Sequence, residues 1–236
     1  MTKENVLFTI IGILIGLISG FFITNSLNQG YIAPAAGVAV PQGAGMPQSG
    51  ALPGGHPAIP GGGGSAPEVQ AAIDKAKQNP EDFEAQMKAA ELYYQIQRFD
   101  GAVEFLKKAN SLQPENQEVI VNLGNANFDA GRYEEAEKWY TKALSKKPDN
   151  LDVRTDFGLT FIFREKPDYD RAVTEFKKVL DADPNHVQAL QNLAVAYTKK
   201  SDAQNASASL AKLEQVDPSN SSLSKLREDV AKLNGN

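Results

Sequence analysis

The chain has 236 residues and a formal net charge of −5 at pH 7, which leaves room for one ordinary domain with additional segments. It contains no Cys and only two His residues, so disulfides, thiolate metal sites and a cysteine nucleophile are excluded, and we expect no metal site. All charged residues except Lys3 and Glu4 follow residue 66 and comprise 23 basic and 28 acidic side chains. Such an acidic segment repels phosphate backbones, so we expect no nucleic-acid partner.

The first 23 residues are predicted to form an N-terminal transmembrane anchor. The run from Val6 to Ile23 is apolar and uncharged, and a helix of that length approaches the thickness of a bilayer's hydrocarbon core. A cleavable signal peptide is the alternative, but its apolar region usually covers about 7–15 residues and precedes a small-residue cleavage site. This run is longer, and Asn25-Ser26-Leu27 fits such a site poorly.

The charges beside this segment predict its orientation. Lys3 and the α-amine outweigh Glu4 on the N-terminal side, and the next charged residue is Glu68. The positive-inside rule then predicts a single-pass protein of a bacterial inner (cytoplasmic) membrane whose C-terminal domain is periplasmic or otherwise extracytoplasmic. Gly12, Gly16 and Gly20 share one helix face, a pattern that favours transmembrane helix packing, although glycine is also simply common in membrane helices.

Residues 24–66 are predicted to be a Gly/Pro/Ala-rich flexible linker. They carry no charge and almost no bulky apolar side chains after Ile32, so they cannot bury enough surface to offset the entropy of ordering. Gly61–Gly64 is not followed by Gly-Lys-Ser/Thr and is therefore not a phosphate-binding loop. We expect this segment to tether the domain that follows it.

A period of about 34 residues organises the rest of the chain. Prolines recur at spacings of 34, 34, 36 and 34 residues, at Pro80, Pro114, Pro148, Pro184 and Pro218. Alanines stand twelve residues before the last four prolines, at Ala102, Ala136, Ala172 and Ala206. The longer spacing predicts a two-residue insertion in the third unit, within residues 164–168. Apolar residues with helical spacing in each unit predict paired amphipathic helices.

These residues and their spacing resemble the tetratricopeptide repeat (TPR) family, whose 34-residue helix–turn–helix units place small residues where two helices cross. The resemblance implies an all-α TPR superhelix with four units over residues 81–218. Residues 67–80 are predicted to be an N-terminal capping helix and residues 219–236 a C-terminal solvating helix, because each presents one apolar face.

The resemblance also implies a binding site, because the first helix of every unit lines a concave groove in such domains. The residues predicted for the protein-binding groove are Tyr94, Val121, Asn122, Asn125, Phe128, Asp156, Leu159 and Asn192. The amide side chains could hydrogen-bond a peptide backbone, or they could simply face solvent. The apolar ones could hold ligand side chains, or they could be buried between helices. The groove is expected to prefer an apolar or basic segment to an acidic one.

The sequence predicts no enzyme and no cofactor, because acidic side chains on exposed helix faces are ordinarily solvated and no nucleophile has triad partners. The predicted function is a membrane-tethered scaffold or adaptor that binds client peptides or proteins. Two alternatives stay open. One is an accessory factor for an exported client such as apocytochrome c, since an anchor followed by TPR units resembles factors of cytochrome c maturation. The other is a self-assembling structural scaffold, a homo-oligomer.

Overall fold

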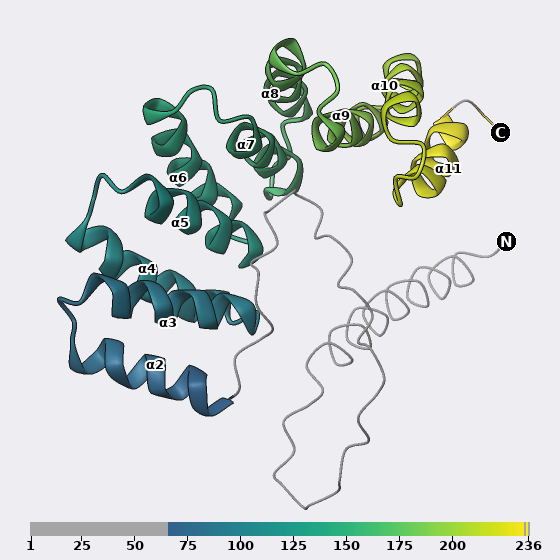
Figure 1. The fold of residues 1–236 in the computed structure, drawn as a ribbon. Helices are drawn as coiled ribbons and strands as arrows, with labels where there is room; N and C mark the ends of the chain where they lie inside the picture. The colour runs from purple at the N-terminus through teal and green to yellow at the C-terminus, as the bar shows by residue number, and fades with distance from the viewer. Residues whose placement is uncertain (1–65, 234, 236) are drawn as a thin grey trace, which may run out of the picture. The chain divides into compact units, whose positions relative to one another are not determined.

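The computed structural model describes residues 66–233 and 235, which form a series of paired α-helices (Figure 1). The helices are α2 (Ala66–Gln78), α3 (Phe83–Gln95), α4 (Phe99–Leu112), α5 (Gln117–Asp129), α6 (Tyr133–Lys146), α7 (Leu151–Phe163), α8 (Tyr169–Ala182), α9 (Val187–Lys199), α10 (Ala203–Val216) and α11 (Leu223–Leu233). Each consecutive pair from α3–α4 to α9–α10 packs closely. This arrangement is the expected all-α repeat fold, in which each unit buries its apolar faces against its neighbours.

The transmembrane anchor with Gly12, Gly16 and Gly20, and the linker, lie outside the described residues. Within residues 66–233, no helix combines the length and apolar character needed to cross a membrane.

Polar side chains cap the N-terminus of the first helix of each unit. Asp82, Asn116 and Asn150 cap α3, α5 and α7 by accepting hydrogen bonds from the backbone N–H groups two or three residues ahead. Each satisfies a donor that the helix itself leaves unpaired. At α9, His186 has this role, and its Nδ1 accepts from the N–H of Ala189 at 3.2 Å. The proline two residues before each of these caps prevents the preceding helix from continuing.

The turns inside the units share one hydrogen-bond pattern. In the second unit, the N–H of Arg132 donates to the carbonyl of Asn127 while Gly131 adopts a φ of 73°. This is a Schellman C-cap, which requires a left-handed residue. In the first and fourth units the left-handed position holds Gln97 (φ 58°) and Ser201 (φ 60°), residue types for which this conformation is strained.

The predicted insertion in the third unit is confirmed. Five residues separate α7 from α8, whereas three separate the helices within each of the other units. The N–H of Asp168 still donates to the carbonyl of Phe161 at 2.8 Å, which is the counterpart of the bond from Arg132 to Asn127. The two extra residues therefore lengthen the turn without changing how the next helix starts.

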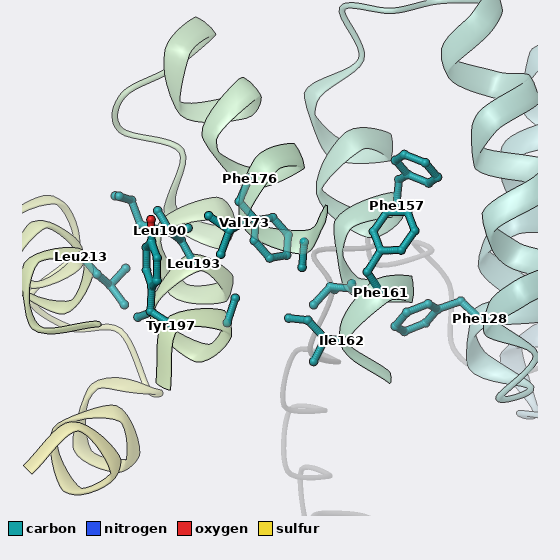
Figure 2. Packing of buried hydrophobic residues seen from close by; sticks show 14 of the residues in the cluster. Phe128, Phe157, Phe161, Ile162, Val173, Phe176, Leu190, Leu193, Tyr197 and Leu213 are labelled. Atoms are coloured by element: carbon teal, nitrogen blue, oxygen red, sulfur yellow. The ribbon is translucent and has the colours of Figure 1, made fainter. Parts of the chain in front are cut away.

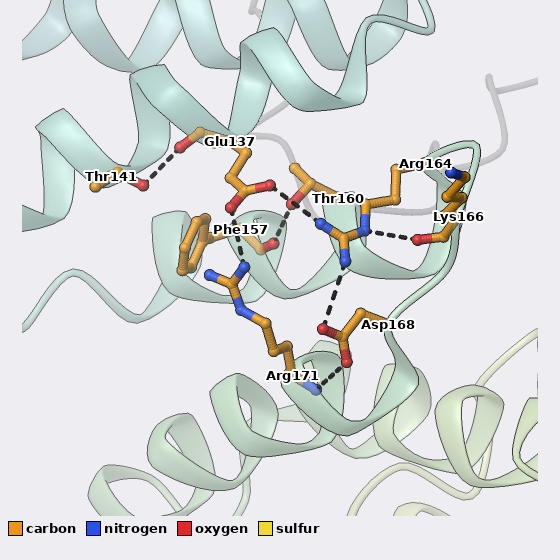
Figure 3. Close-up of polar contacts among 8 residues, drawn as sticks. All are labelled: Glu137, Thr141, Phe157, Thr160, Arg164, Lys166, Asp168 and Arg171. Atoms are coloured by element: carbon orange, nitrogen blue, oxygen red, sulfur yellow. Dashed lines mark hydrogen bonds and ion pairs between the residues drawn. The ribbon is translucent and has the colours of Figure 1, made fainter.

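Ion pairs hold this longer turn against the preceding unit (Figure 3). Glu137 on α6 lies between Arg164 of the turn, at 3.6 Å, and Arg171 of α8, at 3.2 Å. The guanidinium of Arg171 also lies 4.0 Å from the ring centroid of Phe161. Arg164 in turn donates to the carbonyl of Lys166 and pairs with Asp168. One carboxylate thus connects α6, the inserted turn and α8.

The core follows the line of the repeats, between the paired helices. Aromatic and branched side chains from α5 to α10 meet there, as Figure 2 shows for Phe128, Phe161, Phe176, Tyr197 and Leu213. A second cluster joins α2, α3, α4 and one face of α5. Trp139 on α6 packs against both clusters. The capping helix α2 is attached to α3 by Gln86, whose buried Nε2 donates to the carbonyl of Ala76 at 2.8 Å.

Candidate functional site

The first helices of the units lie along one side of the repeat array. Figure 1 shows α5, α7 and α9 on the inner side of the curve, with α6, α8 and α10 outside them. Direct contacts join α5 to α7 and α7 to α9. Side chains on this inner side therefore have two fates: some remain at the surface, and others are buried where one first helix meets the next.

A groove of about 440 Å³ opens between the first helices of units one and two. It is lined by Glu84, Met87, Lys88, Ala90, Glu91 and Tyr94 of α3, by Leu106 of α4, and by Glu118, Asn122 and Asn125 of α5. Its apolar part comes from Met87, Tyr94 and Leu106. Its size and its mixed lining suit a few residues of an extended chain or a short helical turn.

The charged groups of the groove are predominantly acidic. Glu84 and Glu118 lie in the first turns of α3 and α5, where a carboxylate is favourable beside the helix N-terminus. Glu91 is already occupied, since it receives Lys88 Nζ at 3.0 Å and Gln95 Nε2 at 3.0 Å. With Lys88 neutralised by Glu91, the unmatched charge of the lining is that of Glu84 and Glu118.

A hydrogen bond crosses from α3 to α5 at the end of the groove opposite these carboxylates. The hydroxyl of Tyr94 donates to a carboxylate oxygen of Asp129. Burial, this hydrogen bond and the charge of Asp129 all raise the pKa of Tyr94 far above its ordinary value. The hydroxyl therefore stays protonated and remains a donor. On the neighbouring helix α6, the fully buried Tyr140 donates to Asn125 Oδ1 at 2.9 Å and so orients that groove side chain.

The structure places the predicted groove residues in two groups. Tyr94 of α3 and Asn122 and Asn125 of α5 line the groove. Val121, also on α5, is half-buried. Phe128, Asp156, Leu159 and Asn192 are 8%, 5%, 3% and 4% exposed. These four are core residues and not parts of an open surface, because they lie on first helices that pack against one another. The expected continuous amide row therefore does not reach the surface at Asp156 and Asn192.

Of the ten lining residues, only Tyr94, Asn122 and Asn125 are among the eight predicted groove residues. Two of the others, Ala90 and Leu106, lie off the predicted inner face. Both belong to the small-residue and apolar positions that define the repeat, so their pattern indicated core packing alone. The groove reaches them because it extends down to the crossing of α3 and α4. Met87, Glu84 and Glu118 occupy positions on the predicted inner face, where helical spacing from Tyr94 and Asn122 already places them.

The described residues offer no obvious metal site. Between residues 66 and 233, no three His, Asp or Glu side chains are grouped so that they could hold a metal ion.

Comparison with known families agrees with this geometry. A tetratricopeptide repeat model matches residues 64–116, and the model of the middle TPR-like domain of cilia and flagella-associated protein 70 matches residues 122–233. Together with the fold, these matches make the repeat segment a tetratricopeptide-repeat domain. TPR domains in general mediate protein–protein interactions and are not catalytic. No curated protein matches the sequence.

Several solved structures share this fold. PilW, a widely conserved type IV pilus biogenesis factor, is 22% identical with a TM-score of 0.61, over 71% of this chain and 77% of that chain. YrrB, a TPR protein with an unusual peptide-binding site, is 19% identical with a TM-score of 0.59, over 68% and 81%. MamA from Desulfovibrio magneticus RS-1 is 17% identical with a TM-score of 0.58, over 65% and 85%. At these identities the likeness concerns the fold.

Proposed function

We propose that this protein is a membrane-tethered scaffold that binds a peptide segment of a client protein in the groove between α3 and α5. The observation that carries the proposal is the groove itself, in which half-buried apolar side chains and hydrogen-bonding groups lie side by side. Asn122 and Asn125 can give and accept backbone hydrogen bonds whatever the client's sequence, while Met87 and Tyr94 offer apolar contact. The peptide-binding site of the structurally similar YrrB supports the proposal by analogy of fold.

Crosslinking tests the site. A photoreactive phenylalanine analogue replaces Asn122 in the groove in one variant and exposed Glu134 on the outer helix α6 in another. We expect the first variant to give a discrete adduct in cells that the second does not give. The partner identified from the adduct is then purified, and its binding is measured with and without Tyr94→Ala. If binding changes neither with the substitution at Asn122 nor with Tyr94→Ala, the proposal is contradicted.

The proposed tether is the apolar run from Val6 to Ile23. The charge of Lys3 favours an orientation that places the repeat domain outside the cytoplasm of a bacterium. Protease added to intact spheroplasts tests this part. We expect the repeat domain to be digested while a cytoplasmic control stays intact. If the domain is protected in spheroplasts and digested only after lysis, the orientation is opposite to the one proposed. If alkaline carbonate extracts the whole chain from the membrane, the proposed transmembrane anchor is contradicted.

A further inference from the structure

We infer that the groove selects a client segment that combines a basic side chain with a bulky apolar side chain a few residues away. This inference rests on the proposed function and adds the chemistry of the ligand. It follows from how charge and apolar surface are distributed along α3 and α5, the two helices that form the walls.

The acidic end of the groove consists of Glu84 and Glu118. Both residues are exposed, and among the described residues neither carboxylate takes part in a hydrogen bond or an ion pair. They occupy equivalent positions of adjacent repeats, 34 residues apart, so they face the groove from both walls. Two unpaired carboxylates on opposite walls attract a Lys or Arg side chain and repel an acidic one. Lys88 does not cancel this preference, because Glu91 already pairs with it.

The apolar end lies toward the C-terminal end of α3. Tyr94 is held there by its bond to Asp129, and its ring makes an edge contact with Phe99 at 5.2 Å between centroids. Leu106 forms the floor beside Ala90. Because the Tyr94 hydroxyl is already committed to Asp129, the part of the side chain left to meet a ligand is the ring, which favours an apolar partner.

The separation of the two ends sets the spacing in the ligand. Glu84 and Tyr94 are ten residues apart on one helix, which corresponds to roughly 15 Å along its axis. An extended peptide covers about 3.3 Å per residue, so a chain lying along α3 places its basic and apolar side chains about four residues apart. The unpaired carboxylates of Glu84 and Glu118 repel a carboxylate of the ligand at the acidic end.

Labelled synthetic peptides test the inference with the full-length chain in detergent micelles. The reference peptide is nine residues long, with Lys and Leu four residues apart in a Ser/Ala background and both termini blocked. Comparison peptides replace Lys with Glu, replace Lys with Ser, or replace Leu with Ser. Fluorescence anisotropy gives each Kd at two salt concentrations. We expect the Lys/Leu peptide to bind most tightly and to weaken at high salt, and the Glu/Leu peptide to bind most weakly.

Matched variants locate the effect. Glu84→Gln together with Glu118→Gln removes both free carboxylates from exposed positions, so folding should be retained, as circular dichroism will show. This variant should weaken the Lys/Leu peptide about fivefold and leave the Ser/Leu peptide unchanged. The control, Glu134→Gln with Asp181→Asn, changes net charge equally on exposed sites of α6 and α8 outside the groove and should change neither Kd. Tyr94→Ala should weaken both peptides.

The outcomes separate this inference from the proposed function. If the Ser/Leu and Glu/Leu peptides bind as tightly as the Lys/Leu peptide and all lose affinity with Tyr94→Ala, the groove binds peptides without charge selection and the inference is wrong. The same conclusion follows if the control variant weakens binding as much as the groove variant. If no peptide binds, or if Tyr94→Ala changes nothing, the groove is not the binding site and both proposals fail.

Discussion

A Cβ atom at Gly124 of α5 would lie 2.4 Å from Cε1 of Tyr140, on the helix that pairs with it. The third unit repeats this contact, with 2.5 Å between a Cβ at Gly158 and Cε1 of Phe176. In the first and fourth units the equivalent pairs are Ala90 with Leu106 and Ala194 with Leu210. Glycine is therefore paired with an aromatic ring, and alanine is paired with leucine. In each unit the smaller residue on the first helix is matched by a larger side chain on the second, so both kinds of pair fill the helix crossing.

The Gly124→Ala substitution should therefore destabilise the domain by about 1–3 kcal/mol through overpacking, although alanine favours a helix more than glycine does by about 1 kcal/mol. The ring of Tyr140 cannot move aside freely, since it is fully buried and its hydroxyl is bonded to Asn125. Urea unfolding, monitored by circular dichroism, measures the change in the free energy of unfolding.

A double-mutant cycle gives the sharper measurement. Tyr140→Leu alone should cost about 2–4 kcal/mol for lost buried volume. The Gly124→Ala, Tyr140→Leu double variant recreates the pair found in units one and four. We expect it to be more stable than the sum of the single changes predicts, by at least about 1 kcal/mol. Additive effects would show that the two positions do not share one space.

The left-handed turn positions give a second prediction, with opposite signs in different repeats. Gln97 and Ser201 have φ values of 58° and 60°, which glycine adopts without a steric penalty. Ser201→Gly should therefore stabilise the domain by about 0.5 kcal/mol, because the relief of strain exceeds the added entropy of the unfolded chain. Gly131→Ala should cost about 1 kcal/mol for the converse reason. Thermal or urea unfolding measures both, and a loss of stability with Ser201→Gly would contradict the account.

The inserted turn gives a third prediction. Glu137→Gln removes the carboxylate that pairs with both Arg164 and Arg171 (Figure 3), so we expect a loss of about 1 kcal/mol. Hydrogen exchange should become faster in residues 164–168 and in the first turn of α8. The control is Glu135→Gln on the same helix, which breaks only an exposed pair with Lys138 and should change stability by less than about 0.5 kcal/mol. Equal effects of the two changes would show that the network does not hold the turn.

The sequence predicted the repeat well because the residues that end and start its helices act locally. Pro114 and Pro148, together with Asn116 and Asn150, mark helix boundaries whatever the tertiary context, and the longer proline spacing located the insertion. The groove was predicted only in part, because the inner face of a first helix is shared between solvent and the next first helix.

Helix α7 shows why that division is hidden in a sequence. It is apolar around most of its circumference, and nine of its residues, Val153 and Thr155–Ile162, are buried. A helix with no distinct polar face gives no signal of which side meets a ligand. Leu159 and Asp156 were therefore assigned to the groove by equivalence with open positions of other units, although both are buried.

Asp156 gives the last prediction, because it carries a carboxyl group into that covered interface. Burial raises its pKa well above the ordinary value of 3.8, and the negative charges of Asp152 and Asp129 raise it further. The folded state thus holds this proton more tightly than the unfolded state does. The contribution of Asp156 to stability is complete below pH 3.8 and is lost as the pH rises through its pKa in the folded protein.

The second and fourth units place Asn122 and Asn192 at the equivalent position. Asp156→Asn should therefore stabilise the domain at pH 7, because the amide removes the cost of burying a carboxylate at this position. The gain should shrink as the pH falls and approach zero below pH 3.8, where the carboxyl group is neutral in both states. Unfolding curves between pH 3 and pH 8 measure the difference, with exposed Asp181→Asn as the control for net charge. A gain that does not depend on pH, or a loss at pH 7, would show that the charged form of Asp156 is held by a favourable contact that outweighs its burial.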